Sequence, residues 1–140
     1  MRVEREDCLL SDDPALLDLD VVTALLHASY WAADRPREVI AESIQHSLCF
    51  GVYRASDRQQ IGSARVITDR VTFSWVCDVV IAPEFRGRGL GTWLMSCVVQ
   101  HPWVRPTKSH LATKDAHGLY EKFGYVRREH MRRPPETGGR

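Results

Sequence analysis

The chain has 140 residues, of which 44% are hydrophobic and 26% charged, the ordinary balance of one globular domain with a single core. Its 19 basic and 18 acidic residues give a formal net charge of +1, so there is no broad positive field and we expect no nucleic-acid partner. No apolar run approaches the roughly 20 residues that span a bilayer, and residues 1–7 lack the apolar core of a signal peptide. The sequence therefore predicts a cytoplasmic protein with no membrane partner.

Patterns of apolar and turn-forming residues predict a mixed α/β chain. A strand comes first, followed by a helix starting near Asp18 or Asp20 and a second helix opened by Pro36. Three strands then form an antiparallel meander, and a glycine turn with a helix, a short strand, a helix and a last strand complete the domain. In chain order the expected ranges are 3–10, 21–28, 36–44, 48–54, 61–68, 72–82, 90–98, a strand near 110, 114–124 and 125–131. We expect one domain over residues 1–133 and a mobile tail over 134–140.

The cysteines and histidines show no spacing typical of metal sites. Cys8, Cys49, Cys77 and Cys97 lie in apolar segments and form no Cys-x-x-Cys pair, which favours reduced, buried thiols. The six histidines form no His-x-x-x-His pair. The sequence therefore predicts no metal ion.

A glycine-rich turn, Arg-Gly-Arg-Gly-Leu-Gly at residues 86–91, connects an apolar strand to a segment in which Leu90, Leu94 and Val98 recur at helical spacing. A helix that begins on glycines exposes unpaired backbone N–H groups, and the helix dipole adds positive potential there, so the turn predicts phosphate binding. A dinucleotide fingerprint does not fit, because its last glycine would fall on Thr92 or Leu94. A P-loop does not fit either, because no lysine and hydroxyl follow the final glycine.

The remaining pattern, Arg-x-x-Gly-x-Gly, resembles the acetyl-CoA pyrophosphate loop of the GNAT superfamily of acyl-CoA N-acyltransferases. A second motif of that family is an Asn, then an Ala three residues later, then Leu-Tyr and a closing Gly-Phe. Ala116, Leu119, Tyr120 and Gly124 match it, whereas Thr113 stands in place of the Asn and a tyrosine replaces the Phe. The two motifs occur in the correct order, and the resemblance covers residues 76–125.

This resemblance implies an α/β (α+β) fold with a central mixed, mostly antiparallel, splayed sheet flanked by helices. It implies acetyl-CoA as cosubstrate, with the pantetheine arm pairing to the backbone of the strand that enters the glycine turn, as an added strand would. The expected cofactor-binding residues are Val79, Val80, Ile81, Arg86, Gly87, Arg88, Gly89, Leu90, Gly91, Thr92 and Thr113.

Two catalytic residues are expected. Tyr120 matches the family's tyrosine and is predicted to protonate the departing thiolate. Asp78 interrupts an apolar strand, where burying a carboxylate is costly unless the group is catalytic or paired. It is therefore the candidate general base. The alternative is that loop N–H groups, or an arginine such as Arg65, satisfy this carboxylate.

The resemblance also implies that the first helices and their connection form one wall of the acceptor pocket, which here would present Tyr30, Trp31 and Arg35. The aromatic pair would contact substrate by stacking or by covering a cation, although it could equally plug the base of the sheet.

The predicted function is transfer of an acetyl group from acetyl-CoA to a primary amine of a small molecule or an amino-acid derivative. Two alternatives stay open: a protein N-terminus or lysine as acceptor, and a sensor module that binds acetyl-CoA without turnover. Retention of Tyr120 and Asp78 favours the enzyme, because a sensor needs neither. The sequence gives no oligomeric state, and a homodimer is compatible with it.

Overall fold

The computed structural model describes residues 1–136, so the last four residues of the predicted tail at 134–140 lie outside the described part. One mixed sheet forms its centre, with the strands in chain order and every neighbouring pair antiparallel except β5 and β6, which are parallel. The sheet confirms the mixed, mostly antiparallel architecture expected from the sequence. The strands are β1 (Arg2–Arg5), β2 (Cys8–Ser11), β3 (Leu48–Arg54), β4 (Gln60–Thr68), β5 (Phe73–Ile81) and β6 (Lys108–Leu111).

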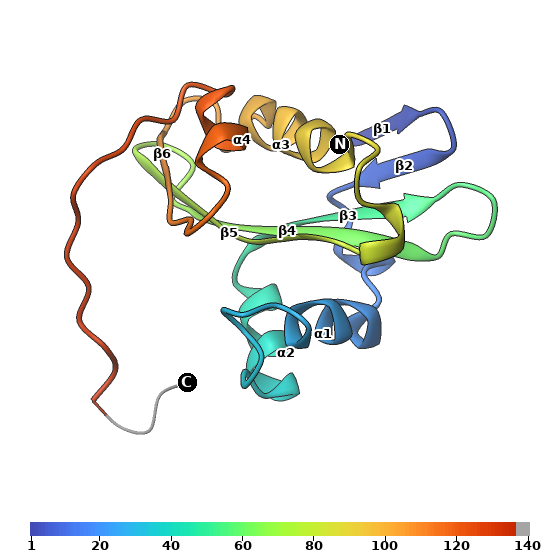
Figure 1. Cartoon of the computed structure of the whole chain (residues 1–140), viewed down its shortest axis with the longest axis horizontal. Helices are drawn as coiled ribbons and strands as arrows, with labels where there is room; N and C mark the ends of the chain where they lie inside the picture. The colour runs from blue at the N-terminus through green and yellow to red at the C-terminus, as the bar shows by residue number, and fades with distance from the viewer. Residues whose placement is uncertain (137–140) are drawn as a thin grey trace.

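Helices cover both faces of this sheet (Figure 1). The helices α1 (Leu19–His27) and α2 (Arg37–Gln45) lie on one face, and α3 (Leu90–Gln100) and α4 (His117–Glu121) lie on the other. Short 3₁₀ turns at Pro14–Leu16 and Pro83–Phe85 precede α1 and α3. Among residues 1–136, no helix has the length and apolar character needed to cross a membrane.

The apolar core lies in two layers separated by the sheet. The larger layer packs α3 against the sheet, with Phe50 and Leu94 fully buried at its centre. The smaller layer packs α1 and α2 against the sheet through Leu26, Ile40 and Val80. Since both faces are covered, β3 is buried along nearly its whole length, which explains its almost continuous apolar sequence.

The start of α1 follows from a local hydrogen-bonding pattern that its sequence predicted. The Asp18 carboxylate accepts hydrogen bonds from the N–H groups of Asp20 and Val21 and so caps the helix. The second helix begins directly after Pro36, also as predicted.

Three predicted elements differ in the structure. The expected first strand at 3–10 is a hairpin of β1 and β2, in which Glu6 turns the chain with φ 52°. The expected helix at 114–124 begins at His117, because residues 114–116 form an irregular turn, so Asp115 is not in its first turn.

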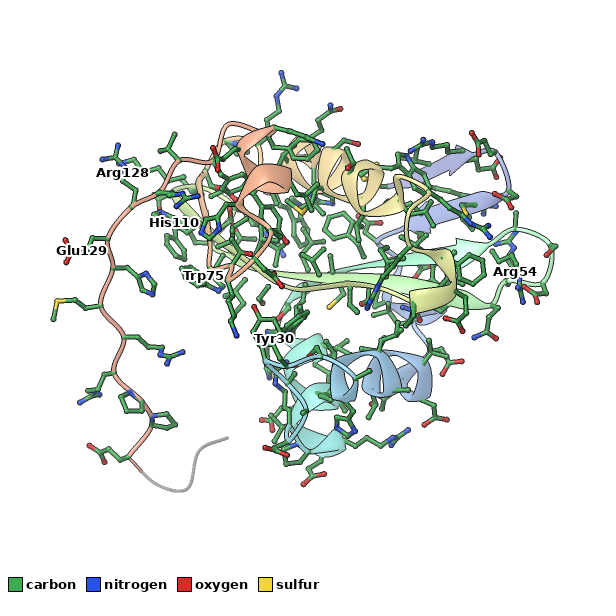
Figure 2. All side chains as sticks on the ribbon, in the orientation of Figure 1. Tyr30, Arg54, Trp75, His110, Arg128 and Glu129 are labelled. Carbon is green, nitrogen blue, oxygen red and sulfur yellow. The ribbon has the colours of Figure 1, made fainter. Side chains whose placement is uncertain are left out.

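The predicted last strand at 125–131 is wrong. Residues 126–136 make no backbone hydrogen bond to the sheet, and the chain extends away from β6 (Figure 1). Val126 and Met131 stay 70% and 97% exposed, and charged residues including Arg128 and Glu129 lie between them (Figure 2). A segment with so little apolar surface gains too little from burial to offset the entropy lost on ordering.

The strands β5 and β6 pair over four residues and then separate. Their register runs from Phe73 opposite Lys108 to Val76 opposite Leu111, and no pairing follows. Beyond this point residues 77–81 keep β4 on one side and have no strand on the other. The splayed sheet implied by the family resemblance is therefore present.

A β-bulge lies where β5 leaves β6. Across β4 and β5, residues 78 and 79 together oppose the single residue Ala64, and Asp78 has φ 55°. Before the bulge, Val76 packs in the layer under α3, and after it Val80 packs against α1 and α2.

The packing of α3 predicts a large stability effect at Leu94, which is fully buried against the sheet. Leu94→Ala should lower the free energy of unfolding by about 2–5 kcal/mol, because it removes buried methyl groups and leaves a cavity. Urea unfolding measures this. Gln100→Ala, at an exposed position of the same helix, is the control and should change stability by less than about 0.5 kcal/mol. Equal effects of the two substitutions would contradict this packing.

Candidate active site

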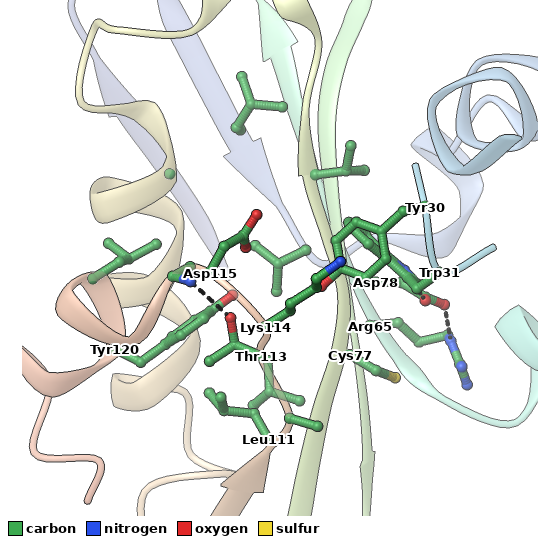
Figure 3. Close-up of a pocket in the computed structure, with 18 of the residues that line it drawn as sticks. Tyr30, Trp31, Arg65, Cys77, Asp78, Leu111, Thr113, Lys114, Asp115 and Tyr120 are labelled. Carbon is green, nitrogen blue, oxygen red and sulfur yellow. Dashed lines mark hydrogen bonds and ion pairs between the residues drawn. The ribbon is translucent and has the colours of Figure 1, made fainter. Parts of the chain in front are cut away.

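A cleft of about 1030 Å³ opens where β5 and β6 separate (Figure 3). Most of its lining comes from four segments: the end of β5, the glycine turn with the start of α3, the segment between β6 and α4, and the loop between α1 and α2. Residues of β4, α4 and the C-terminal segment complete it: Arg65, Ile67, Leu119, Tyr120 and Arg132. The cleft therefore brings together residues from most of the chain's length.

The glycine turn presents free backbone donors to this cleft. Gly87 and Gly89 have φ of 80° and 76°, a conformation that side chains other than glycine rarely adopt. A Cβ atom added to Gly87 or Gly91 would meet nothing within 4 Å, so open space lies beside the backbone. Within the described residues, the N–H groups of residues 87–92 make no hydrogen bond, and the first paired one is that of Trp93. Six consecutive donors at a helix N-terminus form a fitting site for phosphate oxygens.

The two arginines of the turn have contacts of their own. The Nε of Arg86 donates to the carbonyl of Ile81 at 3.1 Å, which ties the turn to the end of β5. The guanidinium of Arg88 lies 5.2 Å from the centre of the Phe85 ring, and its side chain is not among the cleft-lining groups. Every other residue predicted for the cofactor lines the cleft.

Tyr120 lines the cleft from α4, and its hydroxyl makes no hydrogen bond with the described residues. Its ring meets the Tyr125 ring edge-on at 6.1 Å, which fixes its orientation. Burial, with smaller contributions from Tyr125, Tyr30 and Asp115, raises the pKa of Tyr120. The hydroxyl therefore stays protonated at neutral pH, as a proton donor must.

Thr113, which stands where the family motif has Asn, makes a contact within its own segment. Its hydroxyl accepts a hydrogen bond from the Ala116 N–H at 3.0 Å and so holds the turn that leads into α4 (Figure 3). The side chain lines the cleft, but it is engaged in this turn.

The Asp78 carboxylate is nearly buried and accepts three hydrogen bonds from side chains. Arg35 Nη1 and Arg65 Nε both contact Oδ2, at 2.8 and 2.9 Å, and Trp31 Nε1 contacts Oδ1 at 3.1 Å. Burial alone would raise the pKa of Asp78, but the charges and hydrogen bonds of Arg65 and Arg35 outweigh it and hold the pKa below its ordinary value. The carboxylate is thus ionised and ties the α1–α2 loop to β5.

Tyr30 and Trp31 form the wall of the cleft that the sequence predicted. They are 60% and 43% exposed and meet edge-on at 5.1 Å, so they do not plug the base of the sheet. Lys114 from the opposite wall places its Nζ 5.3 Å from the centre of the Tyr30 ring (Figure 3). Sequence reasoning missed Lys114, because nothing local indicates which residue faces it across the cleft.

Among residues 1–136, no group of three or more His, Cys, Asp or Glu side chains is placed to hold a metal ion.

Comparison with known proteins assigns this fold and cleft to a class. Residues 45–127 match the family described as Acetyltransferase (GNAT) domain. A Gibberella zeae protein that carries the name "Putative acetyltransferase" is 33% identical over 138 residues, covering 84% of this chain and 78% of that protein. The chain belongs to the GNAT acetyltransferase family, and the enzyme class predicted from the sequence is confirmed.

Solved structures agree with this assignment. A GNAT-family protein from Xanthomonas campestris pv. campestris has a TM-score of 0.86 and 36% identity, over 96% of this chain and 98% of that chain. Glucosamine-6-phosphate N-acetyltransferase from Arabidopsis thaliana has a TM-score of 0.70 over 94% of this chain and 99% of that chain. At 14% identity, the second likeness shows the shared fold alone.

The ion pairs of Asp78 predict a stability effect with a defined pH dependence. Asp78→Asn should lower the free energy of unfolding at pH 7 by about 3–5 kcal/mol, because two largely buried arginines lose their anion. The pKa is lowered by folding, so the contribution is complete above pH about 4 and is lost as the pH falls through the lowered value. Urea unfolding from pH 2 to pH 8 measures the difference between the two proteins.

Asp57→Asn is the matched control for this substitution. Asp57 also pairs with an arginine, Arg54, but both side chains are exposed, and exposed pairs contribute little. Similar losses for the two substitutions would argue against a structural role for the buried cluster.

Proposed function

We propose that this protein transfers an acetyl group from acetyl-CoA to the primary amine of a small molecule or an amino-acid derivative. The proposal rests mainly on one observation: five residues with unpaired backbone N–H groups (Gly87 and residues 89–92) and Tyr120 with its unpaired hydroxyl line the same cleft. The N–H groups fit a pyrophosphate, and the Tyr120 hydroxyl can donate its proton to a leaving thiolate. When bound, acetyl-CoA supplies the thioester carbonyl that an amine attacks.

The backbone of β5 offers a second point of attachment. Residues 79–81 face the cleft with an edge that β6 does not cover. An extended chain of amide groups, such as a pantetheine arm, can pair with such an edge as an added strand does. Only residues 82–85 separate this edge from the glycine turn, so together they would direct the thioester toward Tyr120.

A small acceptor fits the walls of the cleft better than a folded protein does. Tyr30 and Lys114 approach one another from opposite walls, which narrows the opening on the acceptor side. Holding a small amine against the thioester then removes most of the entropic cost of their meeting.

The reaction needs a neutral amine and a proton for the thiolate. The amine nitrogen forms a bond to the carbonyl carbon as the carbon–sulfur bond breaks, and Tyr120 donates its proton to the sulfur. Asp78 is the candidate for accepting the amine proton, directly or through water. Its lowered pKa makes it a weak base, so we propose that its larger contribution is to position the acceptor wall through Trp31 and Arg35.

The first test concerns the glycine turn. Gly89→Val should weaken coenzyme A binding by at least about tenfold, because a β-branched residue at φ 76° distorts the turn that carries the free N–H groups. Calorimetric titration with coenzyme A measures the affinity. Gly124→Val is the control, since Gly124 has a similar φ of 86° but lies outside the turn. Unchanged affinity in Gly89→Val would refute the placement of the pyrophosphate.

The second test concerns the proton donor. Tyr120→Phe should lower kcat by about 10²-fold while leaving coenzyme A affinity within about twofold, since general acid catalysis contributes about that much. Thiol release from acetyl-CoA across an amine panel measures turnover.

Tyr53→Phe is the control for the loss of a tyrosine hydroxyl. The Tyr53 hydroxyl is buried without a hydrogen-bond partner and lies outside the cleft, so its removal should leave turnover unchanged. Full activity of Tyr120→Phe on every amine would remove the acid role. If the wild-type protein binds coenzyme A but no amine in the panel causes thiol release, the result would instead support the sensor alternative.

A further inference from the structure

The acceptor end of the cleft holds more positive than negative charge. Arg35 and Arg65 both line it, and they share the single carboxylate of Asp78. Their side chains are only 22% and 16% exposed, so water screens this charge incompletely. One guanidinium charge is therefore left without a counterion in a partly buried place, which is unfavourable unless an anion arrives.

The geometry of these ion pairs leaves donors free. Arg35 reaches Asp78 through Nη1 alone, and its Nε and Nη2 make no hydrogen bond within the described residues. Arg65 uses Nε for Asp78 and Nη1 for the Ser47 hydroxyl, which leaves Nη2 free. A guanidinium with two adjacent free N–H groups matches the two oxygens of a carboxylate or a phosphate.

Charges on the facing wall do not reverse this balance. The segment between β6 and α4 contributes Lys114 and Asp115, which offset each other, and Arg132 from the extended C-terminal segment adds positive charge. No acidic side chain other than Asp78 and Asp115 lines the cleft among the described residues.

We infer that the acceptor amine also carries an acidic group, a carboxylate or a phosphate, which binds to the free donors of Arg35 and Arg65. This inference rests on the proposed function, because it names the class of amine that the acetyl group would reach. Trp31, held by Asp78, forms the adjacent wall of the cleft.

A purely cationic acceptor fits this site poorly. Both oxygens of Asp78 already accept hydrogen bonds and its charge is shared by two guanidinium groups, so an incoming ammonium group would gain little from it. It would also face two guanidinium groups, and like charges this close repel. The same positive surroundings favour the neutral form of the acceptor amine, which is the form that reacts.

The test uses matched pairs of amines that differ in the acidic group alone. Three ω-amino acids of increasing length (glycine, β-alanine and γ-aminobutyrate) are compared with their amides, and O-phosphoethanolamine is compared with ethanolamine. Binding is measured by calorimetry on the full chain saturated with coenzyme A, and turnover by thiol release from acetyl-CoA. Comparing the carboxylate pairs with the phosphate pair shows which of the two acidic groups the site binds.

We expect at least one acid-bearing probe to bind about 10- to 100-fold more tightly than its neutral partner, as hydrogen bonds to a charged group provide. Arg35→Gln should abolish this ratio by raising KM for the acid, with a much smaller change in kcat. Arg35→Lys keeps the positive charge but loses the two adjacent N–H donors of the guanidinium group, so it should retain part of the preference for acids. Arg37→Gln, at an exposed arginine outside the cleft, is the matched control and should keep the full ratio.

The outcomes separate this inference from the proposed function. Equal binding of acids and their neutral partners, or an unchanged ratio in Arg35→Gln, would overturn the inference while leaving acetyl transfer intact. Selective binding of an acid-bearing probe without thiol release would support the anion site and count against the enzymatic function. Failure of every acid-bearing probe to bind the coenzyme A complex would overturn the inference.

Discussion

The central constraint in this structure is the early end of the pairing between β5 and β6. After Val76 the two parallel strands separate, and the backbone groups of residues 77–81 face a cleft instead of a neighbouring strand. Polar backbone groups that lose a strand partner need another one. The same separation exposes the glycine turn, admits Tyr120 from α4 and leaves room between the two helical walls, so each part of the proposed site depends on it.

Electrostatics divide the cleft into two ends with different roles. At the glycine turn the positive potential comes from backbone N–H groups and the start of α3, and it requires no particular side chain. At the acceptor end it comes from Arg35 and Arg65, whose positions depend on Asp78. The first end suits the pyrophosphate of the proposed cosubstrate, acetyl-CoA. The second depends on side chains, so under the proposed function substitutions there would change the acceptor without disturbing cofactor binding.

Much of the fold could be predicted from local sequence patterns. The helix starts at Asp18 and Pro36 and the three central strands follow from such patterns. The glycines at residues 87–91 likewise predict the turn that leads into α3. The last strand could not be judged this way, because pairing at a sheet edge depends on burial that a short charged segment does not reveal. The site could be predicted only in part: Tyr120 matches a motif, and the sequence offered Arg65 as a partner of Asp78. The contact of Lys114 with Tyr30 and the second ion pair of Asp78, with Arg35, join segments far apart in sequence and were not predicted.

The bulge in β5 constrains the number of residues in this strand as well as their identity. Side chains alternate between the two faces of a strand, so the extra residue reverses the facing of all that follow. It turns Asp78 toward the α1–α2 loop, where an unbroken alternation from Val76 would have turned it into the apolar layer under α3. Regular pairing of the same residues with β4, without the bulge, would exchange the faces of Val80 and Ile81 and turn Asp78 into the apolar layer under α3. Relatives that keep the ion pairs of this carboxylate with the α1–α2 loop should therefore keep the bulge as well.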